Sequence, residues 1–251
     1  MPRFFSETSL AAITPGQEIC LPDAIFHHAV RVRRLKSGDD CILFDGDGNV
    51  WRVTLTGIDK RRAFVRAENQ MPPPPPPSLP ITLALAITAV DRMDWALQKG
   101  TELGVAAFLP FYGEHSNARL SDARQERRFE HWQAVIIGAC EQCGQNRLPR
   151  LSPPVPFDTL LNTVTGEAAA WRLDADASQT LAAALQNART LSPPEQVFLM
   201  VGPEGGFAPN EVRAADAAGW QAVRLGPRIL RAETAAAAAI TLVQAALGDL
   251  A

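Results

Sequence analysis

The first third of the chain carries short hydrophobic runs that are separated by polar turn residues. Alternation of apolar and polar positions over so few residues is typical of strands that bury one face. One longer segment, residues 23–35, has the spacing of a helix. We therefore predict a small β-rich domain that contains one helix. Its predicted strands cover residues 17–21, 40–45, 50–58 and 63–67.

Beyond residue 80 the pattern changes to continuous apolar runs that alternate with amphipathic segments. Continuous runs are expected for strands buried on both faces, and such strands alternate with helices in parallel sheets. The sequence therefore predicts an α/β fold, with a mostly parallel sheet covered by helices on both faces. Ligands of such sheets bind beyond the carboxyl ends of the strands. The predicted strands cover 81–89, 105–110, 168–173, 197–201 and 222–225, and the predicted helices include 91–103 and the alanine-rich segment 235–247.

A run of six prolines, residues 72–77, separates these two patterns, and a further proline follows at position 80. Such a run is extended and semi-rigid, and it cannot enter a helix or a central strand. We interpret it as a spacer. The predicted organisation is a small β-rich domain over 1–71, a linker over 72–80 and an α/β domain over 81–251.

Composition adds limits on function. The chain has 251 residues, of which 47% are hydrophobic and 20% charged, as is ordinary for a folded protein. We find neither a secretory signal nor an apolar stretch long enough to cross a bilayer, so we expect a cytoplasmic protein with no membrane partner. The formal net charge of −3 argues against attraction of nucleic acid by the whole molecule. RNA contacts must then come from local basic clusters, at 31–36, 60–62 and 124–128, each of which is also consistent with an ordinary solvated face.

No metal site is expected. Only Cys140 and Cys143, of the four cysteines, have the spacing of metal ligands, and a zinc site would need a second such pair. The turn over residues 45–49 superficially resembles a calcium loop. However, Val50 stands where that loop requires glycine, and Thr56 stands where it requires glutamate.

Two glycine-containing loops follow predicted strands, at 202–207 and 225–231. Glycine lets the backbone approach a ligand closely and adopt positive φ. The spacing is not that of a dinucleotide-binding loop, and there is no phosphate-binding loop, so NAD and ATP are poor fits. The helix after the second loop is nearly uncharged, which indicates that it is buried and that Arg231 and Glu233 lie close to the core.

Three segments together resemble the RsmE family of small-subunit ribosomal RNA methyltransferases, which belong to the SPOUT class. They are residues 92–105 (RMDWALQKGTELGV), 202–207 (GPEGGF) and 225–235 (LGPRILRAETA). The resemblance also includes residues 2–5, 28–34, 44–46 and 140–144. The order and spacing of these pieces make the match specific.

The resemblance implies a PUA-like RNA-binding barrel followed by a SPOUT domain, whose last segment threads a deep trefoil knot. The general rule that chains are unknotted would not have suggested this. It also implies a homodimer, S-adenosyl-L-methionine as cofactor, and 16S ribosomal RNA within the small subunit as partner. The implied reaction methylates N3 of one uridine, number 1498 in the standard numbering. The residues implied to surround the cofactor are Leu199, Met200, Gly202, Glu204, Gly205, Leu225, Gly226, Ile229, Leu230 and Arg231.

Methylation at uracil N3 requires the base to lose its N3 proton, so positive charge near the base should stabilise the anion that develops. We hypothesise that Arg231 has this role and that Arg3 is a second candidate. Glu233 either orients Arg231 or accepts the proton. His115 and Gln145 stand where relatives commonly have arginine, which should weaken phosphate contacts. The residues expected to bind RNA are Arg31, Arg33, Arg34, Arg119 and Arg147.

Three alternatives remain at this point. The chain could be an RNA-binding protein that keeps the fold but has lost methyl transfer. It could be a related methyltransferase that acts on another RNA, such as a transfer RNA. It could also be a small-molecule enzyme with a nucleotide cofactor, although that would leave the barrel-like first domain unexplained.

Overall fold

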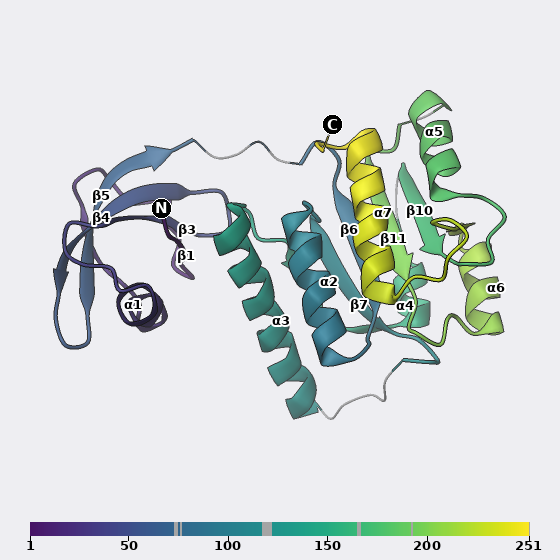
Figure 1. The fold of residues 1–251 in the computed structure, drawn as a ribbon, viewed down its shortest axis with the longest axis horizontal. Coiled ribbons are helices and arrows are strands. Elements are labelled where there is room, and N and C mark those ends of the chain that lie inside the picture. Colours follow the sequence, from purple (N-terminus) through teal and green to yellow (C-terminus); the bar gives the residue numbers. More distant parts are fainter. Residues whose placement is uncertain (73–74, 76, 117–121, 165–166, 192, 251) are drawn as a thin grey trace. The chain divides into compact units, whose positions relative to one another are not determined.

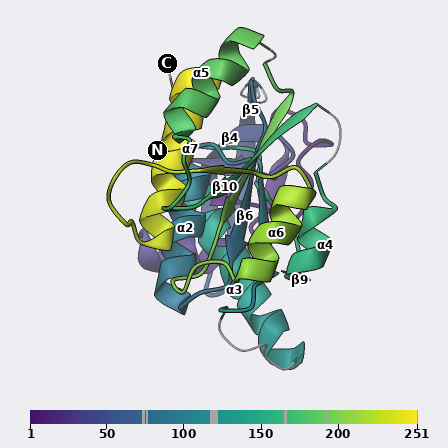
Figure 2. The same cartoon turned by 90° about the vertical axis from the view of Figure 1, so that its right-hand side faces the viewer.

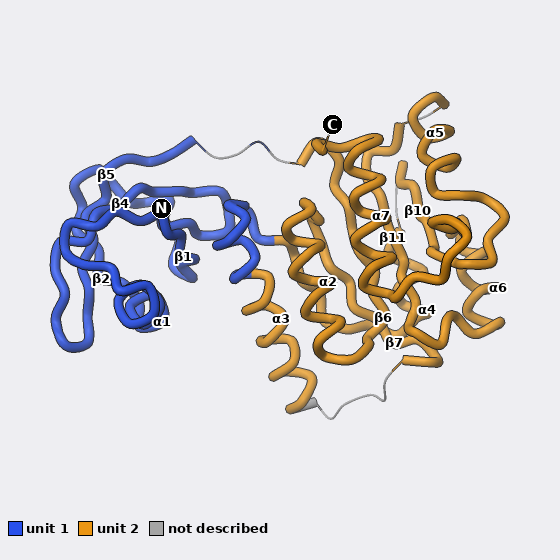
Figure 3. The backbone as a smooth tube through the Cα atoms, viewed as in Figure 1, with its two compact units in different colours: residues 1–75, 137–148 blue, residues 76–136, 149–251 orange. Residues whose placement is uncertain are grey.

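The computed structural model describes residues 1–72, 75, 77–116, 122–164, 167–191 and 193–250. The chain forms two compact units, coloured separately in Figure 3. Residues 1–75 and 137–148 form the first unit, and residues 76–136 and 149–251 form the second. The predicted boundaries place 137–148 in the second domain, whereas their contacts group them with the first. One of these contacts is the hydrogen bond that the Phe5 N–H donates to Glu141 Oε1 at 3.0 Å.

The first unit is built on a five-stranded sheet with the order β1-β3-β4-β5-β2. Only the pair β1 and β3 is parallel. The predicted helix begins at Asp23 as expected and ends at Val32, where its second half is a π-helix. The elements are β1 (Arg3–Phe5), β2 (Glu18–Cys20), α1 (Asp23–Phe26), η1 (His27–Val32), β3 (Asp40–Phe44), β4 (Val50–Ile58) and β5 (Ala63–Met71).

The second unit contains a parallel sheet with the order β12-β10-β11-β6-β7-β8, and β9 also pairs with β7. Every strand pair in it is parallel, as predicted. Two of its strands, β8 and β9, are too short for a hydrophobic pattern to reveal. The strands are β6 (Ile81–Ala86), β7 (Ala107–Tyr112), β8 (Arg150–Leu151), β9 (Val155–Pro156), β10 (Ala168–Leu173), β11 (Gln196–Val201) and β12 (Gln221–Val223).

Helices cover both faces of this sheet, which confirms the predicted layers (Figures 1 and 2). On one face α7 packs against α2, α5 and β11, and on the other α4 packs against α6. Small alanine side chains let α7 lie close to its neighbours, and Ala236, Ala239, Ile240 and Val243 are fully buried. The helices are α2 (Val90–Glu102), α3 (Asp122–Cys143), α4 (Phe157–Leu161), α5 (Leu181–Leu191), α6 (Pro209–Ala217) and α7 (Ala232–Leu247).

The order of the strands sets the position of the loops. Strand β10 lies between β11 and β12, although β11 follows it and β12 comes later still in the sequence. Because all three strands are parallel, their carboxyl ends meet at one edge of the sheet. In the part of the chain that the structure describes, no helix is both long and apolar enough to cross a membrane.

Candidate functional site

A pocket of about 630 Å³ lies beyond the carboxyl ends of β10, β11 and β12. Three loops form its walls, and the first helical residues of α7 close it. Two of these loops are the glycine loops that the sequence singled out. The third follows β10. The lining residues are 173–176, 201–207, 212, 223–226, 228–232 and 235.

The first glycine loop runs from β11 to α6. A Cβ atom on Gly202 would lie 2.9 Å from the ring of Phe207, so no larger residue fits there. Gly206 has φ +73°, a conformation that favours glycine. Arg92 of α2 forms an ion pair with Glu204. The backbone of this loop is thus held close to the pocket, with little side-chain volume in the way.

Buried Glu211 fastens the end of this loop. Its Oε2 accepts the N–H of Ala208 at 2.8 Å, and its Oε1 accepts the N–H of Glu114 at 2.8 Å. Ala208 is the N-cap of α6 and offers no side-chain cap, so Glu211 supplies the reciprocal half of a capping box. His115 Nδ1 lies 3.2 Å from the carbonyl oxygen of Gly206. His115 therefore contacts the first glycine loop.

The second glycine loop runs from β12 to α7. Gly226 has φ +131°, which only glycine adopts readily. Ile229 is 90% exposed, which is exceptional for a large apolar side chain, and it lies at the rim of the pocket. Arg231 is the N-cap of α7. The loop therefore presents both an apolar and a cationic side chain beside the pocket.

Most residues expected to bind the cofactor line this pocket. They are Gly202, Glu204, Gly205, Leu225, Gly226, Ile229, Leu230 and Arg231. Leu199 and Met200 do not line it, since both are fully buried within β11. They support the strand from which the first glycine loop begins.

The expectation that Arg231 lies close to the core is wrong, because it precedes the buried part of α7 and is exposed. Among the described residues none pairs with its guanidinium. Glu233 is half-buried, and its Oε2 is buried with no hydrogen-bond partner in the described part of the chain. Arg231 lines the pocket and is available to a ligand there, whereas Glu233 does not line the pocket.

Arg3 lies in the first unit and does not line the pocket. Its guanidinium stands 5.4 Å from the centre of the Phe44 ring, and its Nε and Nη2 atoms are buried without a partner among the described residues. Burial lowers the pKa of this guanidinium.

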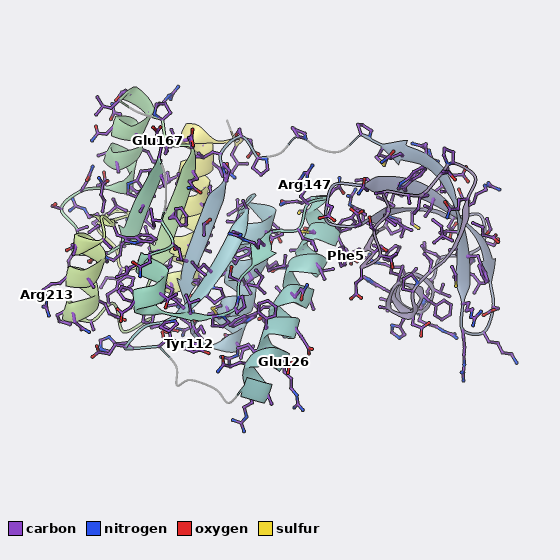
Figure 4. The ribbon with its side chains drawn as sticks, turned by 180° about the vertical axis from the view of Figure 1, so that it is seen from behind. Phe5, Tyr112, Glu126, Arg147, Glu167 and Arg213 are labelled. Carbon is purple, nitrogen blue, oxygen red and sulfur yellow. The ribbon has the colours of Figure 1, made fainter. Side chains whose placement is uncertain are left out.

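The residues expected to bind RNA fall into different environments. Arg31, Arg33 and Arg34 are exposed, and Arg31 Nη2 donates to the carbonyl oxygen of Lys60 at 3.5 Å, so two basic clusters lie side by side. Arg119 lies outside the described residues. Arg147, labelled in Figure 4, donates to the carbonyl oxygen of Asp47 at 2.9 Å. Arg147 therefore has a structural contact within the first unit.

The loop after β10 is the part of the pocket that sequence reasoning missed. Its lining residues are 173–176 and include two carboxylates, Asp174 and Asp176. It contains no glycine, which was the signal used to choose the other loops. The predicted strand 168–173 combined with the carboxyl-end rule could have found it.

Neither the fold nor the described residues suggest a metal centre: no group of three or more His, Cys, Asp or Glu side chains among them is arranged to hold a metal ion. Cys41 and Cys140 are buried, and burial raises the pKa of each thiol to about 12. All four cysteines are free. Cys20 and Cys143 are exposed.

Two family models match the chain. The family model described as an RNA methyltransferase domain matches residues 75–244, and the model described as an RNA methyltransferase PUA domain matches residues 21–68. The fold and the pocket thus define an RNA methyltransferase class in which an α/β domain with a parallel sheet accompanies a PUA-like domain.

The relatives narrow the class to one family. The chain is 34% identical over 238 residues to the ribosomal RNA small subunit methyltransferase E of Synechocystis, covering 91% of this chain and 73% of that protein. It is 28% identical to the Bacillus subtilis protein of the same name, covering 97% and 96%. The chain belongs to the ribosomal RNA small subunit methyltransferase E (RsmE) family.

Solved structures support the same assignment. A ribosomal RNA small subunit methyltransferase E from Neisseria gonorrhoeae was crystallised bound to S-adenosyl methionine. Its structure matches this chain with a TM-score of 0.89 and 35% sequence identity, over the full length of both chains. A Legionella pneumophila protein in complex with the same cofactor has a TM-score of 0.90 and 33% identity, covering 99% of this chain and 98% of that one.

Proposed function

We propose that this protein transfers a methyl group from S-adenosyl-L-methionine to N3 of one uridine, number 1498 in the standard numbering, in the 16S ribosomal RNA of the small subunit. The observation that carries the proposal is the pocket between two glycine loops at the carboxyl ends of β11 and β12. The same loops carry the resemblance to the family, and two similar proteins bind this cofactor in their crystal structures.

The pocket suits such a donor. Gly202 and Gly226 allow backbone groups to approach a ligand closely, and the walls combine apolar surface with carboxylates and arginines. Bound there, the donor would supply an electrophilic methyl group on a positively charged sulfur. The chain's task is then to hold the uracil ring in line with that methyl group, and orientation of this kind can lower a barrier by roughly 7 kcal/mol or more.

Arg231 is our candidate for the group that stabilises the anionic uracil. Its guanidinium is exposed beside the pocket and has no partner among the described residues, so it is available to a carbonyl oxygen of the base. Glu233, two residues further on, would orient Arg231 or take the N3 proton. Arg3 remains a second candidate that would act from the first unit.

We further infer that residues after β11 thread the deep trefoil knot of the SPOUT class. What supports this proposal is that the chain belongs to the RsmE family and that the two glycine loops of the resemblance line one pocket. We also propose that the first domain covers 1–71, the linker 72–80 and the methyltransferase domain 81–251. The protein would be cytoplasmic. It would form a homodimer whose two copies share the RNA site. Exposed arginines of the first unit, Arg31, Arg33 and Arg34, would bind the RNA backbone.

The test is direct. Small subunits purified from a strain that lacks the protein are incubated with it and with labelled donor, and the modified nucleoside is identified by mass spectrometry. We expect 3-methyluridine at one position. Label in transfer RNA alone would favour the alternative substrate. Donor binding without transfer to any RNA would favour a protein that has lost activity.

We predict that Arg231→Ala slows single-turnover methyl transfer by about 10² or more, since a preorganised donor group is removed from the developing charge. Donor and subunit binding are measured separately by titration. Arg213→Ala is the matched control, because Arg213 of α6, labelled in Figure 4, is exposed and does not line the pocket. An Arg231→Ala enzyme with unchanged binding and unchanged rate would eliminate this role for Arg231.

A further inference from the structure

Arg172 is a buried charge beside the pocket. It lies in β10, opposite Met200 of β11 and Ala222 of β12, and only 1% of it is exposed. A buried guanidinium is strongly unfavourable unless it is paired and hydrogen-bonded. The groups that pair with the Arg172 guanidinium therefore indicate its structural role.

Those partners come from three separate segments around the pocket. Arg172 Nη1 donates to Asp174 Oδ2 at 2.6 Å, and Nη2 donates to Asp216 Oδ1 of α6 at 3.1 Å. The guanidinium also stands 5.4 Å from the centre of the Phe207 ring, at the end of the first glycine loop. One side chain thus ties the loop after β10 to the wall formed by the first glycine loop and α6.

Asp174 is held firmly. Its Oδ1 accepts the N–H of Asp176 at 3.0 Å, and its own N–H donates to the carbonyl oxygen of Val223 at 2.9 Å. Both Asp174 and Asp176 line the pocket, whereas Arg172 and Asp216 do not. The carboxylate of Asp174 therefore has a fixed position in the pocket wall. The guanidinium of Arg172, outside the pocket lining, pairs with it.

We propose that Asp174 is a donor-binding carboxylate and that Arg172 is its positioning residue. This inference rests on the proposed function. The methyl donor carries a positive sulfonium, and transfer of its methyl group leaves a neutral thioether. A carboxylate in the pocket wall attracts the cationic donor more strongly than the product, so Asp174 makes the pocket selective for the donor over S-adenosylhomocysteine.

The experiment is calorimetric titration of the full-length protein with S-adenosylmethionine and, separately, with S-adenosylhomocysteine. We expect Asp174→Asn to weaken donor binding roughly tenfold and product binding less than about threefold, which lowers the selectivity for the donor. Asp216→Asn is the matched control, since it removes the charge of the other carboxylate that pairs with Arg172, on a residue outside the pocket. It should leave the ratio of the two affinities unchanged.

Arg172 is tested through the same ratio. Arg172→Lys keeps the positive charge, but an ammonium group cannot bond to Asp174 and Asp216 together as the planar guanidinium does. The ratio of donor affinity to product affinity should therefore fall, although Arg172 does not line the pocket. In the double variant with Asp174→Asn the two effects on the ratio should not add. Thermal unfolding of each variant separates lost folding from lost selectivity.

The outcomes are distinct. If Asp174→Asn keeps the wild-type ratio, or if Asp216→Asn lowers it equally, the role of Asp174 is overturned while the proposed function stands. If the wild-type protein binds neither compound, the proposed function itself fails. A ratio that falls for Asp174→Asn but not for Arg172→Lys leaves Asp174 in place and removes Arg172 as its positioning residue.

Discussion

Glycine at position 202 is required by a neighbouring side chain. A Cβ atom there would lie 2.9, 3.0 and 3.2 Å from three ring atoms of Phe207, all closer than ordinary van der Waals contact. Phe207 itself packs against Phe157 and beside buried Arg172, so its ring has little freedom to move away. The conformation of the first glycine loop is therefore fixed by the packing of Phe207 against Phe157 and Arg172.

We predict that Gly202→Ala weakens binding of S-adenosylmethionine by at least about tenfold, because the loop must shift to relieve the contact. Titration calorimetry measures the affinity, and circular dichroism verifies the fold. Gly138→Ala is the control: it lies inside α3 with open space around its Cβ position, and alanine there should stabilise the helix by roughly 0.5–1 kcal/mol. Donor affinity unchanged in Gly202→Ala would contradict the prediction.

At the scale of elements, the turn between β3 and β4 shows how a ligand-like pattern can be structural. Asp45 is buried, and both of its carboxylate oxygens accept hydrogen bonds, from the N–H groups of Leu10, Asp47 and Asn49 and from the Asn49 side chain. Burial by itself would raise the pKa of Asp45, but these bonds hold the pKa below its ordinary value. The carboxylate organises the turn, which explains the resemblance to a calcium loop.

This turn predicts a pH dependence. Because the pKa of Asp45 is lower in the folded protein, its ionised form stabilises the fold above pH 4, and that contribution is lost as the pH falls below the unfolded value of about 3.9. Asp45→Asn should therefore reduce the free energy of unfolding by about 1–3 kcal/mol at pH 7. Urea unfolding at pH 7 and pH 3 measures the difference. A difference of equal size at both pH values would show that charge is not the cause.

Elements with strong patterns were predictable. The helix beginning at Asp23 and the buried strand beginning at Ile81 were both expected and are both confirmed, because local periodicity reports burial. The strand at 63–67 extends to Met71, since pairing with β4 continues past the end of the alternating pattern. No local sequence pattern predicts that residues 137–148 belong to the first unit. Their grouping depends on contacts with residues distant in sequence, such as the hydrogen bond between Glu141 and the backbone of Phe5.

At the scale of the whole molecule, apolar side chains are exposed on two helices that pack together. Val90 and Trp95 of α2 are 47% and 40% exposed, and Leu242 of α7 is 40% exposed. Exposed apolar surface of this kind often marks an interface between proteins. It is where we place the proposed homodimer contact.

We predict that the wild-type protein is a dimer and that Trp95→Glu is a monomer, since a buried unpaired charge would oppose association. Sedimentation equilibrium measures the mass of each. Leu191→Glu is the control, because Leu191 is also highly exposed but lies on α5. A wild-type protein that is monomeric at micromolar concentration would remove both the dimer and the RNA site shared between two copies.

The sequence by itself determined the kinds of element, the two glycine loops and the family to which they belong. It did so because periodicity, glycine content and motif order are local properties of the chain. The tertiary structure alone decided that β10 lies between β11 and β12, which adds Asp174 to the pocket and places Arg172 behind it. Strand order depends on how the helices pack across the whole sheet, so no short stretch of sequence contains it.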